Sequence, residues 1–597
     1  MRILIALLLL LAPPFAQAQL RMGKRERFVP GEVIVRYKES ATGSARLQAL
    51  KAHSAVKLGT PAKHFDHVKI REGLSVDEAV SELSRDPEIE SVQPNYIYRT
   101  FALPNDPQLG QQWGLKNTGQ TITLPAGSTS TNNPGIAGAD MSAEAAWSIR
   151  TDCSSVVVAI IDSGINYRHE DLAGNMWDGG AAYPNHGYDF VNNDNDPSDL
   201  LGHGTHVAGT IGAVGNNGVG VAGVCWKAKL MAVKVSESGT ATSADMAKGF
   251  DFAIANGAKV INLSMGNTEN DPVLKAAVQK ASDAGIVIVA AAGNDSSDND
   301  QEPTYPCSYK LANVLCVAAV DQKGQLASFS NFGKTTIHVA APGANIRNSF
   351  AGTTKSGLIP FTAGSPFVWQ GNGWSTNPVT FQTDAGAKTV DVYTATPGYD
   401  GNKNYANNVD ARTYTSVSLA GYDSAVLTLI GAYDLALGDS ISFGYKATGG
   451  DPFAGGGTVY TDSNFQTDRE SIVRDFPLTN CRTAACSFGL RFRSDAAQTS
   501  YGVAILAFGL EALTVNTNSY QIQSGTSMAA PHVTGLAALI LAQNPAYKAA
   551  DVITAIKEGG RAEASLNGKI STGKAIDAAS SLKFIGAPKS VTVTVGN

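Results

Sequence analysis

Three short segments, far apart in the chain, place an aspartate, a histidine and a serine where they could catalyse acyl transfer. Asp162 ends the apolar run VVAIID, His203 opens the small-residue segment HGTHVAGT, and Ser527 lies within GTSMAAPH. A serine hydroxyl is a weak nucleophile until a histidine removes its proton, and a buried aspartate fixes the tautomer of that histidine. These residue types predict hydrolysis of a peptide bond near neutral pH.

A fourth segment offers a donor for the negative charge that develops on the reacting carbonyl oxygen. The sequence AAAGN follows an apolar run and ends in the side-chain amide of Asn294, which suits an oxyanion hole. Other residues compete for these roles. Ser524 is a rival nucleophile, whereas His206 and His532 are better interpreted as core or supporting residues. Asn294 alone could also simply end a turn.

The elements that must position these residues read as an α/β domain. Continuous apolar runs, rather than alternating ones, indicate strands that are buried on both faces of a parallel sheet. Helix-like spacing over 243–256 and 271–284 lies between them. The predicted strands are Val156–Ile161, Leu230–Val235, Lys259–Leu263, Ile286–Ala291 and Val314–Val320.

The pattern changes between about residues 351 and 518, where apolar and polar residues alternate. Ile441, Phe443 and Tyr445, for example, alternate with small or polar neighbours, and Asn, Gly, Asp and Ser turns separate such runs. This pattern is typical of an antiparallel sandwich. Helical, alanine-rich character returns from about Tyr520, so the β-rich zone is predicted to be inserted into the α/β domain.

The N-terminal region predicts export and a small folded unit. Arg2, the apolar stretch Ile3–Ala12 and Ala16-Gln17-Ala18 have the order of a secretory signal peptide, and the apolar stretch is too short to span a bilayer. From Phe28 to about Ala102 a mixed α and β pattern follows, without a nucleophile constellation of its own.

Composition and cysteine content agree with a folded, exported protein. The 597 residues are 43% hydrophobic and 16% charged, with 46 Lys plus Arg against 52 Asp plus Glu, a net charge of −6. This balance excludes a disordered chain and gives no reason to expect nucleic acid or an anionic membrane as partner. Six cysteines suit an oxidising compartment. Short separations favour two local pairs, which leaves a third: Cys307–Cys316, Cys481–Cys486 and Cys153–Cys225.

The segments IIDSG, HGTHVAGT, AAAGN and GTSMAAPH, in that chain order, resemble those of the subtilisin family of serine peptidases. The resemblance implies the three-layer fold of that family with a mainly parallel sheet. It implies that Asp162 orients His203, that His203 is the general base and acid, and that Ser527 is the nucleophile. Asn294 and the backbone N–H of Ser527 would form the oxyanion hole.

The same resemblance implies where substrate binds. Ser264, Met265 and Gly266 resemble the family segment that pairs with substrate as an added strand. Ala291, Ala292 and Gly293 would complete the wall of the primary specificity pocket, and these small residues predict a broad preference for large apolar side chains. Acidic residues at 295, 298 and 300 would either add tolerance for basic side chains or form a solvated loop.

A structural calcium site is a further expectation. Asp171 matches a family calcium ligand, and the loop that contains Asn217, Val219 and Val221 matches the family's binding loop. Carbonyl and amide oxygens suit a hard cation. The loop reads as one residue longer than the family pattern, so an Asn-Gly turn without metal stays open as the alternative. No catalytic cofactor is expected.

The segment before the catalytic domain resembles the family's inhibitory prodomain, which would act as an intramolecular inhibitor and be cleaved near Ala102–Pro104. The expected product is a secreted zymogen, extracellular or periplasmic, that hydrolyses proteins or peptides and has no membrane anchor. The alternative is a non-catalytic binding protein that uses the β insert, which resembles jelly-roll modules.

The expected division of the chain follows from these patterns. A signal peptide (1–18) and the prodomain (19–102) precede the catalytic peptidase domain. That domain is expected to be split into an N-terminal segment (103–350) and a C-terminal segment (519–597), with the inserted β-sandwich (351–518) between them.

Overall fold

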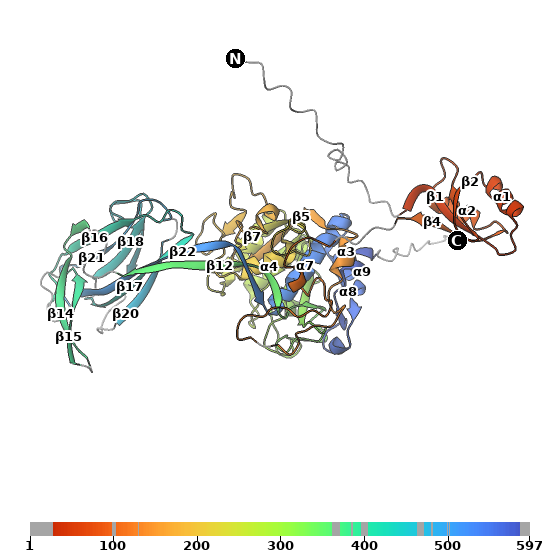
Figure 1. Cartoon of the computed structure of the whole chain (residues 1–597). Coiled ribbons are helices and arrows are strands. Elements are labelled where there is room, and N and C mark those ends of the chain that lie inside the picture. Colours follow the sequence, from red (N-terminus) through yellow and green to blue (C-terminus); the bar gives the residue numbers. More distant parts are fainter. Residues whose placement is uncertain are drawn as a thin grey trace, which may run out of the picture. The chain divides into compact units, whose positions relative to one another are not determined.

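The chain forms two compact units, one ending at Phe101 and the other beginning at Ala102 (Figure 1). The predicted signal peptide lies outside the residues that the structure describes, and so does Ala102 at the expected cleavage site. The structure is a computed structural model, and it describes residues 28–97, 103–128, 130–360, 370–383, 386–395, 404–436, 438–462, 471–478, 481–497, 499–500 and 502–584.

The first unit is a small α+β fold. Its described strands form an antiparallel sheet in the order β2-β3-β1-β4, and Val33, Val35, Val68 and Leu83 lie in its core. Ser75 caps α2 in a capping box with Glu78, which explains why the helix begins there. The elements are β1 (Phe28–Tyr37), α1 (Gly43–Ala52), β2 (Val56–Ala62), β3 (Phe65–Lys69), α2 (Val76–Leu83) and β4 (Ile89–Tyr96).

The sheet of the second unit is mainly parallel, as the apolar runs predicted. Nine described strands follow the order β23-β24-β11-β10-β9-β8-β5-β7-β6, and each neighbouring pair is parallel except β23 with β24. The strands are β5 (Asp152–Asp162), β6 (Gly187–Asp189), β7 (Lys227–Lys234), β8 (Val260–Leu263), β9 (Val287–Ala291), β10 (Val314–Val320), β11 (Val339–Pro342), β23 (Arg561–Ala562) and β24 (Lys574–Ala575).

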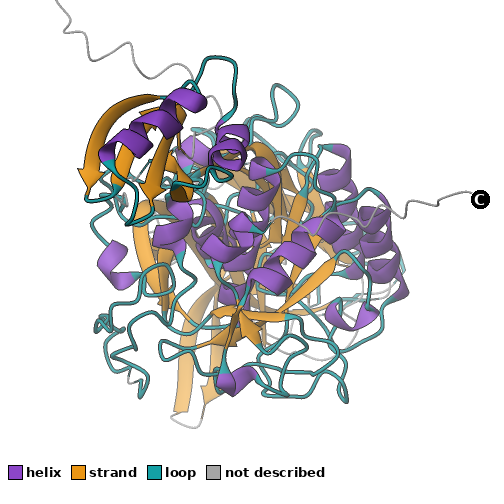
Figure 2. Ribbon diagram, turned by 90° about the vertical axis from the view of Figure 1, so that its right-hand side faces the viewer, coloured by secondary structure: helices purple, strands orange, loops and turns teal. Residues whose placement is uncertain are grey.

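Helices cover both faces of this sheet, which confirms the α/β prediction (Figure 2). In β5, Val158 and Ile160 belong to the apolar core that contains α4 and α7, whereas Ala159 and Ile161 belong to the core that contains α5 and α6. A strand buried on both faces therefore reads as one continuous apolar run. The helices are α3 (Ala143–Trp147), α4 (His203–Gly212), α5 (Ser243–Ala255), α6 (Pro272–Asp283), α7 (Thr526–Gln543), α8 (Ala549–Gly559) and α9 (Ala578–Lys583).

The inserted zone is all β, as its alternation predicted. Two described sheets enclose a separate apolar core: one has the order β14-β15-β22-β17-β20 with β12 also paired to β22, and the other β13-β16-β21-β18-β19. The strands are β12 (Ile346–Pro360), β13 (Gln370–Asn372), β14 (Ser375–Thr383), β15 (Gly386–Thr394), β16 (Asp410–Val417), β17 (Ser424–Asp434), β18 (Ser440–Lys446), β19 (Thr458–Asp462), β20 (Ser471–Pro477), β21 (Cys486–Arg493) and β22 (Gly502–Gln523).

A two-stranded ribbon joins the sandwich to the α/β domain (Figure 1). Strands β12 and β22 pair antiparallel from Ile346 opposite Gln523 to Pro360 opposite Gly509, with two register shifts. The expected boundaries at 350/351 and 518/519 fall inside these strands. Only two residues separate the end of β22 from the start of α7, so the insert leads directly into the segment that carries Ser527.

Ion pairs also join the insert to the α/β domain. Arg482 pairs with Asp196, Asp423 pairs with Arg168, and Arg482 Nη1 donates to the Asp423 carbonyl at 3.0 Å. The predicted disulfides are confirmed, and one of them closes the short loop that carries Arg482: Cys153–Cys225, Cys307–Cys316 and Cys481–Cys486. Within the described residues, the helices lack the length and apolarity needed to cross a membrane.

Replacing Arg482 with alanine should lower the thermal midpoint of the chain. The Asp196 side chain is only 12% exposed and would lose a charged partner. Such hydrogen bonds contribute about 1.5–3 kcal/mol. The matched control is Lys355→Ala on the ribbon, because Lys355 is 69% exposed and its pair with Glu511 should contribute about 0.5 kcal/mol. Calorimetry in a Ser527→Ala background measures both, and equal midpoints would contradict the role of Arg482.

Candidate active site

Asp162 and His203 meet at the carboxyl end of the central strands. Asp162 is the last residue of β5 and is 1% exposed, and its Oδ1 lies 2.7 Å from His203 Nδ1. His203 is the first residue of α4, after Gly202 with φ of +95°. A Cβ at Gly202 would lie 2.1 Å from the Phe350 ring, so only glycine fits this turn.

The surroundings of His203 favour its charged form. Burial opposes the imidazolium, but the charge and hydrogen bond of Asp162 and the charge of Asp199 more than offset it, so the pKa of His203 is raised above its usual value. A histidine in this setting can accept a proton from a hydroxyl and hold it as a stabilised cation.

Asp199 is a buried carboxylate that sequence reasoning did not single out. It is fully buried, and Oδ1 accepts from Ser163 Oγ at 3.0 Å and from Gly202 N–H at 2.8 Å. Its Oδ2 accepts from the N–H of Thr205 at 2.9 Å and from the Thr205 hydroxyl at 2.6 Å. Asp199 thus ties the residue after Asp162 to the start of α4. Several acids cluster in 189–199, so the sequence offers no signal that distinguishes it.

Ser527 is the second residue of α7, close to the helix N-terminus. Its Oγ donates to the Ser264 carbonyl at 3.0 Å, and Ser264 Oγ donates to the Ser527 carbonyl at 2.9 Å. Among the described residues, Ser527 Oγ makes no hydrogen bond to His203. The Ser527 hydroxyl must therefore release the Ser264 carbonyl before His203 can accept its proton.

A cavity of about 450 Å³ brings together six of the ten predicted catalytic and substrate-binding residues. Asp162, His203 and Ser527 line it, and so do Ser264, Met265 and Gly266, whereas Met246 and Leu274 add an apolar surface. The described residues that line this cavity do not include Ala291, Ala292 or Gly293. Gly293 contacts the start of α7 instead, where its N–H donates to Thr526 Oγ1 at 3.1 Å.

Asn294 is oriented by Thr526, a residue that sequence reasoning did not name although it lies inside GTSMAAPH. The Oδ1 atom of Asn294 accepts from Thr526 N–H at 2.8 Å and from Thr526 Oγ1 at 3.0 Å. Among the described residues its Nδ2 has no hydrogen-bond partner, so both N–H bonds are available to a ligand. The side chain of Asn294 and the N-terminus of α7 are thus adjacent donors.

The other histidines of the motifs are buried inside the fold. His206 is fully buried and His532 is 2% exposed. Burial lowers the pKa of His206 to about 3 and that of His532 to about 4. Both rings stay neutral near pH 7 and bond to backbone carbonyls, His206 to Ile346 and His532 to Met528. In the acidic loop, Asp300 accepts hydrogen bonds from the hydroxyls of Thr335 and Thr336.

Hydrogen bonds connect the four predicted metal ligands, three of them directly through Asp171. Asp171 is fully buried; its Oδ1 accepts from Asn217 Nδ2 at 2.9 Å, and its Oδ2 accepts from Val221 N–H at 2.8 Å and from the Tyr520 hydroxyl at 2.9 Å. Val219 instead donates its N–H to Asn217 Oδ1 at 2.8 Å, so its link to Asp171 runs through Asn217.

A second carboxylate, Asp106, belongs to this site and was not predicted. It is 4% exposed, and its Oδ2 accepts from Asn216 N–H at 2.7 Å while its Oδ1 is buried without a partner. Burial raises the pKa of both Asp106 and Asp171, and the charge of Asp171 adds to the effect at Asp106. The described residues form no group of three or more His, Cys, Asp or Glu side chains that could hold a metal ion. Two buried carboxylates with an unpaired oxygen nevertheless fit a divalent cation completed by carbonyl and amide oxygens.

Two family models match this chain. The subtilase model matches residues 154–396 and 401–567, and the model of the fervidolysin N-terminal prodomain matches residues 16–95. A thermophilic serine proteinase of Bacillus sp. (strain AK1) is 36% identical over 347 residues, which are 57% of this chain and 76% of that protein. Thermitase of Thermoactinomyces vulgaris is 40% identical over 224 residues, which are 37% of this chain and 75% of that protein.

A solved protease structure from Pseudoalteromonas arctica covers 81% of this chain and 99% of its own, at 22% identity and a TM-score of 0.43. The subtilase match covers more than half of the chain and contains Asp162, His203 and Ser527. The chain belongs to the subtilase family and is a serine endopeptidase of the subtilisin type.

Proposed function

We propose that Asp162, His203 and Ser527 are the catalytic triad of a secreted, self-processing zymogen. The observation that carries the proposal is the 2.7 Å contact between Asp162 and His203 beside a cavity that Ser527 also lines. The alternative, a binding protein that uses the β insert, would leave this arrangement without a purpose.

In the proposed reaction, the Ser527 hydroxyl releases the Ser264 carbonyl, and Oγ attacks the carbonyl carbon of the substrate as His203 takes its proton. Asp162 stabilises the imidazolium that forms. The oxyanion accepts hydrogen bonds from Asn294 Nδ2 and from Ser527 N–H at the N-terminus of α7. His203 then protonates the leaving amine. Water, deprotonated by the same imidazole, attacks the acyl carbon; the bond to Ser527 Oγ breaks, His203 returns the proton to that oxygen, and the second product leaves as a carboxylic acid.

The cavity supports a preference for apolar side chains. Ser264, Met265 and Gly266 are proposed to pair with the substrate backbone as an added strand. The surfaces of Met246 and Leu274 would contact apolar side chains. Ala291, Ala292 and Gly293 do not line this cavity, and their proposed place on the wall of the primary pocket follows from the family resemblance.

The first unit is proposed to inhibit the second until it is removed. The match to a protease prodomain supports this role, and the proposed cut lies near Ala102–Pro104. Export by the predicted signal peptide would bring the chain to a periplasm or to the outside of the cell, where the three disulfides are stable.

Calcium is proposed to stabilise the mature fold. Asp106, Asp171 and the amide of Asn217 would hold it, together with carbonyl oxygens of the loop around Val219 and Val221. When bound, the cation would neutralise two buried carboxylates and fasten the segment after the prodomain to the body of the domain.

Ser527→Ala should abolish both prodomain removal and casein hydrolysis, because it removes the nucleophile. The matched control is Ser524→Ala, which removes only a hydroxyl that accepts from Asn345 N–H at 2.8 Å. Gel analysis of maturation and a casein assay measure both variants. If Ser527→Ala matures and digests casein as the unmodified chain does, the triad assignment is wrong.

Asp162→Asn should change both the rate and the pH profile. The neutral imidazole is the active form, so kcat/KM falls as pH drops through the pKa of His203, which Asp162 raises. Removing that charge lowers the pKa, so the acidic limb moves to lower pH while the plateau falls by about 10⁴-fold. A pH series of kcat/KM checks this, and an unmoved acidic limb would contradict the coupling.

Asp106→Asn should reduce the calcium dependence of thermal stability. Calcium at about 100 times its Kd would stabilise the chain by about 2.7 kcal/mol, and a chelator would remove this contribution. Asp321→Asn is the matched control, because Asp321 is 3% exposed and only caps a turn. Melting with calcium and with chelator measures each increment. An undiminished increment in Asp106→Asn would rule out this ligand.

A further inference from the structure

Two buried asparagines lie behind the candidate oxyanion donor and have no role in the proposed reaction. Asn299 and Asn331 are each 1% exposed, and neither lines the cavity nor touches the triad. Burying a side-chain amide is unfavourable unless its donors and acceptors are paired. The partners of these two amides therefore indicate what they hold in place.

Asn331 binds the backbone on both sides of Asn294. Its side-chain Oδ1 accepts from the backbone N–H groups of Asp295 at 2.7 Å and Ser297 at 3.1 Å. Its backbone N–H donates to the Gly293 carbonyl at 3.0 Å. Gly293 has φ of +110°, and a Cβ there would lie 2.4 Å from Asn331 Nδ2. The Asn331 side chain thus packs directly against the residue before Asn294.

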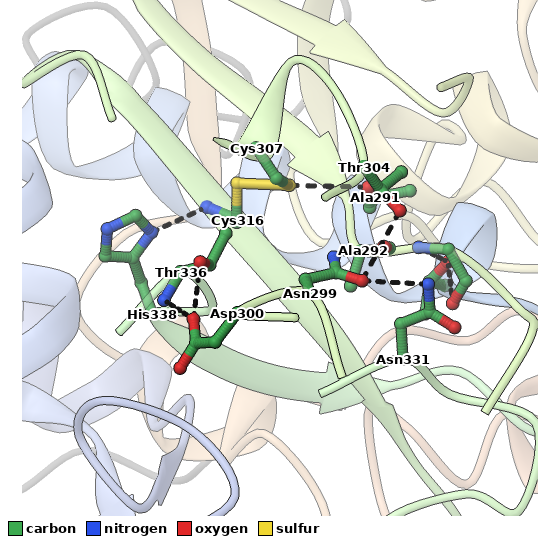
Figure 3. Close-up of a disulfide and its surroundings, with 12 residues drawn as sticks. Ala291, Ala292, Asn299, Asp300, Thr304, Cys307, Cys316, Asn331, Thr336 and His338 are labelled. Carbon is green, nitrogen blue, oxygen red and sulfur yellow. Dashed lines mark hydrogen bonds between the residues drawn. A yellow bond between two sulfur atoms is a disulfide. The ribbon is translucent and has the colours of Figure 1, made fainter. Parts of the chain in front are cut away.

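Asn299 extends this support to the end of β9. Its Nδ2 donates to the Ala292 carbonyl at 2.8 Å, and its Oδ1 accepts from Asn331 Nδ2 at 3.0 Å (Figure 3). The two side chains form one continuous path of hydrogen bonds from the Ala292 carbonyl to the N–H groups of Asp295 and Ser297, which bracket Asn294 in the sequence. Each amide both donates and accepts along this path, so the conformation of the segment is determined from both ends.

Rigid elements anchor the pair. The hydroxyl of Ser330, the residue before Asn331, accepts from Ala319 N–H in β10 at 3.0 Å. On the other side, Tyr305 and Asn267 exchange backbone hydrogen bonds of 2.8 and 3.1 Å, and Cys307 is bonded to Cys316 in β10 (Figure 3). The loop that carries Asn299 is therefore held by the central sheet and by the segment that contains Ser264–Gly266.

The exposed side chain of Asn294 needs such support. An oxyanion donor acts only when it is already in place where the charge develops, and small displacements cost much of its effect. Thr526 fixes the Oδ1 end of Asn294, but the backbone of residues 292–295 has to be fixed separately. A buried network that is fully hydrogen bonded gives that rigidity.

We propose that Asn331, assisted by Asn299, is a positioning residue that holds Asn294 as an oxyanion donor. The proposal rests on the proposed function of Asn294. Asn331 is expected to act through Asn294, without contact with the substrate. Its removal should therefore weaken stabilisation of the transition state and leave substrate binding unchanged.

A double-mutant cycle tests this, with each variant expressed as the full chain and assayed after removal of the prodomain. Asn294→Ala should lower kcat by about 10²–10³-fold. Asn331→Ala should lower kcat by about 10–100-fold with KM within about threefold, because only the transition state uses the donor. In the Asn294→Ala background, Asn331→Ala should have almost no further effect on kcat, since both changes remove the same interaction.

The matched control is Asn313→Ala. Asn313 is 4% exposed and its Nδ2 donates to the Ile286 carbonyl at 2.8 Å, just before the opposite end of β9. This variant should lose stability but keep kcat. If Asn331→Ala does not fold, Asn299→Ala takes its place in the same cycle, with a smaller expected loss of kcat.

The outcomes separate this inference from the proposed function. A full additional loss of kcat in the Asn294→Ala background would overturn the inference, and so would an equal loss in Asn313→Ala. If Asn294→Ala lowers kcat but neither Asn331→Ala nor Asn299→Ala does, the inference alone fails. If Asn294→Ala itself keeps kcat, the oxyanion assignment fails, and with it the basis of the inference.

Discussion

The hydrogen bond between Asp162 Oδ1 and His203 Nδ1 is the contact on which the rest of the site depends. It requires a carboxylate at the buried end of β5 and a helix that begins within reach of it. The parallel sheet supplies the first condition, because the carboxyl ends of its strands meet at one edge. Gly202 and Asp199 supply the second, since one permits the turn before α4 and the other ties that turn to Ser163.

The same edge gathers the other groups of the proposed reaction. Strand β8 leads into Ser264–Gly266, strand β9 leads into Asn294, and α7 begins beside both. Each of these segments is bonded to the start of α7 through Thr526 or Ser527. A few hydrogen bonds to the start of α7 therefore bring the proposed nucleophile, oxyanion donor and substrate strand together.

The β insert fits into this arrangement without separating its components. Because β12 and β22 pair antiparallel, the chain leaves the α/β domain at Ile346 and returns beside it at Gln523. The ends of the insert are thus adjacent, which is the usual condition for a tolerated domain insertion. The ion pairs of Arg482 and Asp423 add fixed contacts away from the ribbon.

Much of this could be predicted from local patterns. Continuous apolar runs indicated the strands of the sheet, alternation indicated the sandwich, and short separations indicated two disulfides. The residues that were missed, Asp106, Asp199, Thr526 and Asn331, are polar groups whose importance comes from what surrounds them. Asp106 is one acid among many until burial leaves its Oδ1 without a partner. Which residues line the cavity likewise depends on packing, and Ala291–Gly293 are not among them.

The sequence by itself determined the type of chemistry and the class of fold, because a reactive residue type and a hydrophobic period are properties of neighbours along the chain. Only the tertiary structure decided which atoms meet. Asp162 and His203 are 41 positions apart and Asn294 and Thr526 are 232 apart, so their contacts depend on the packing of whole elements. The same holds for the hydroxyl of Ser527, which donates to the carbonyl of Ser264, a residue 263 positions away.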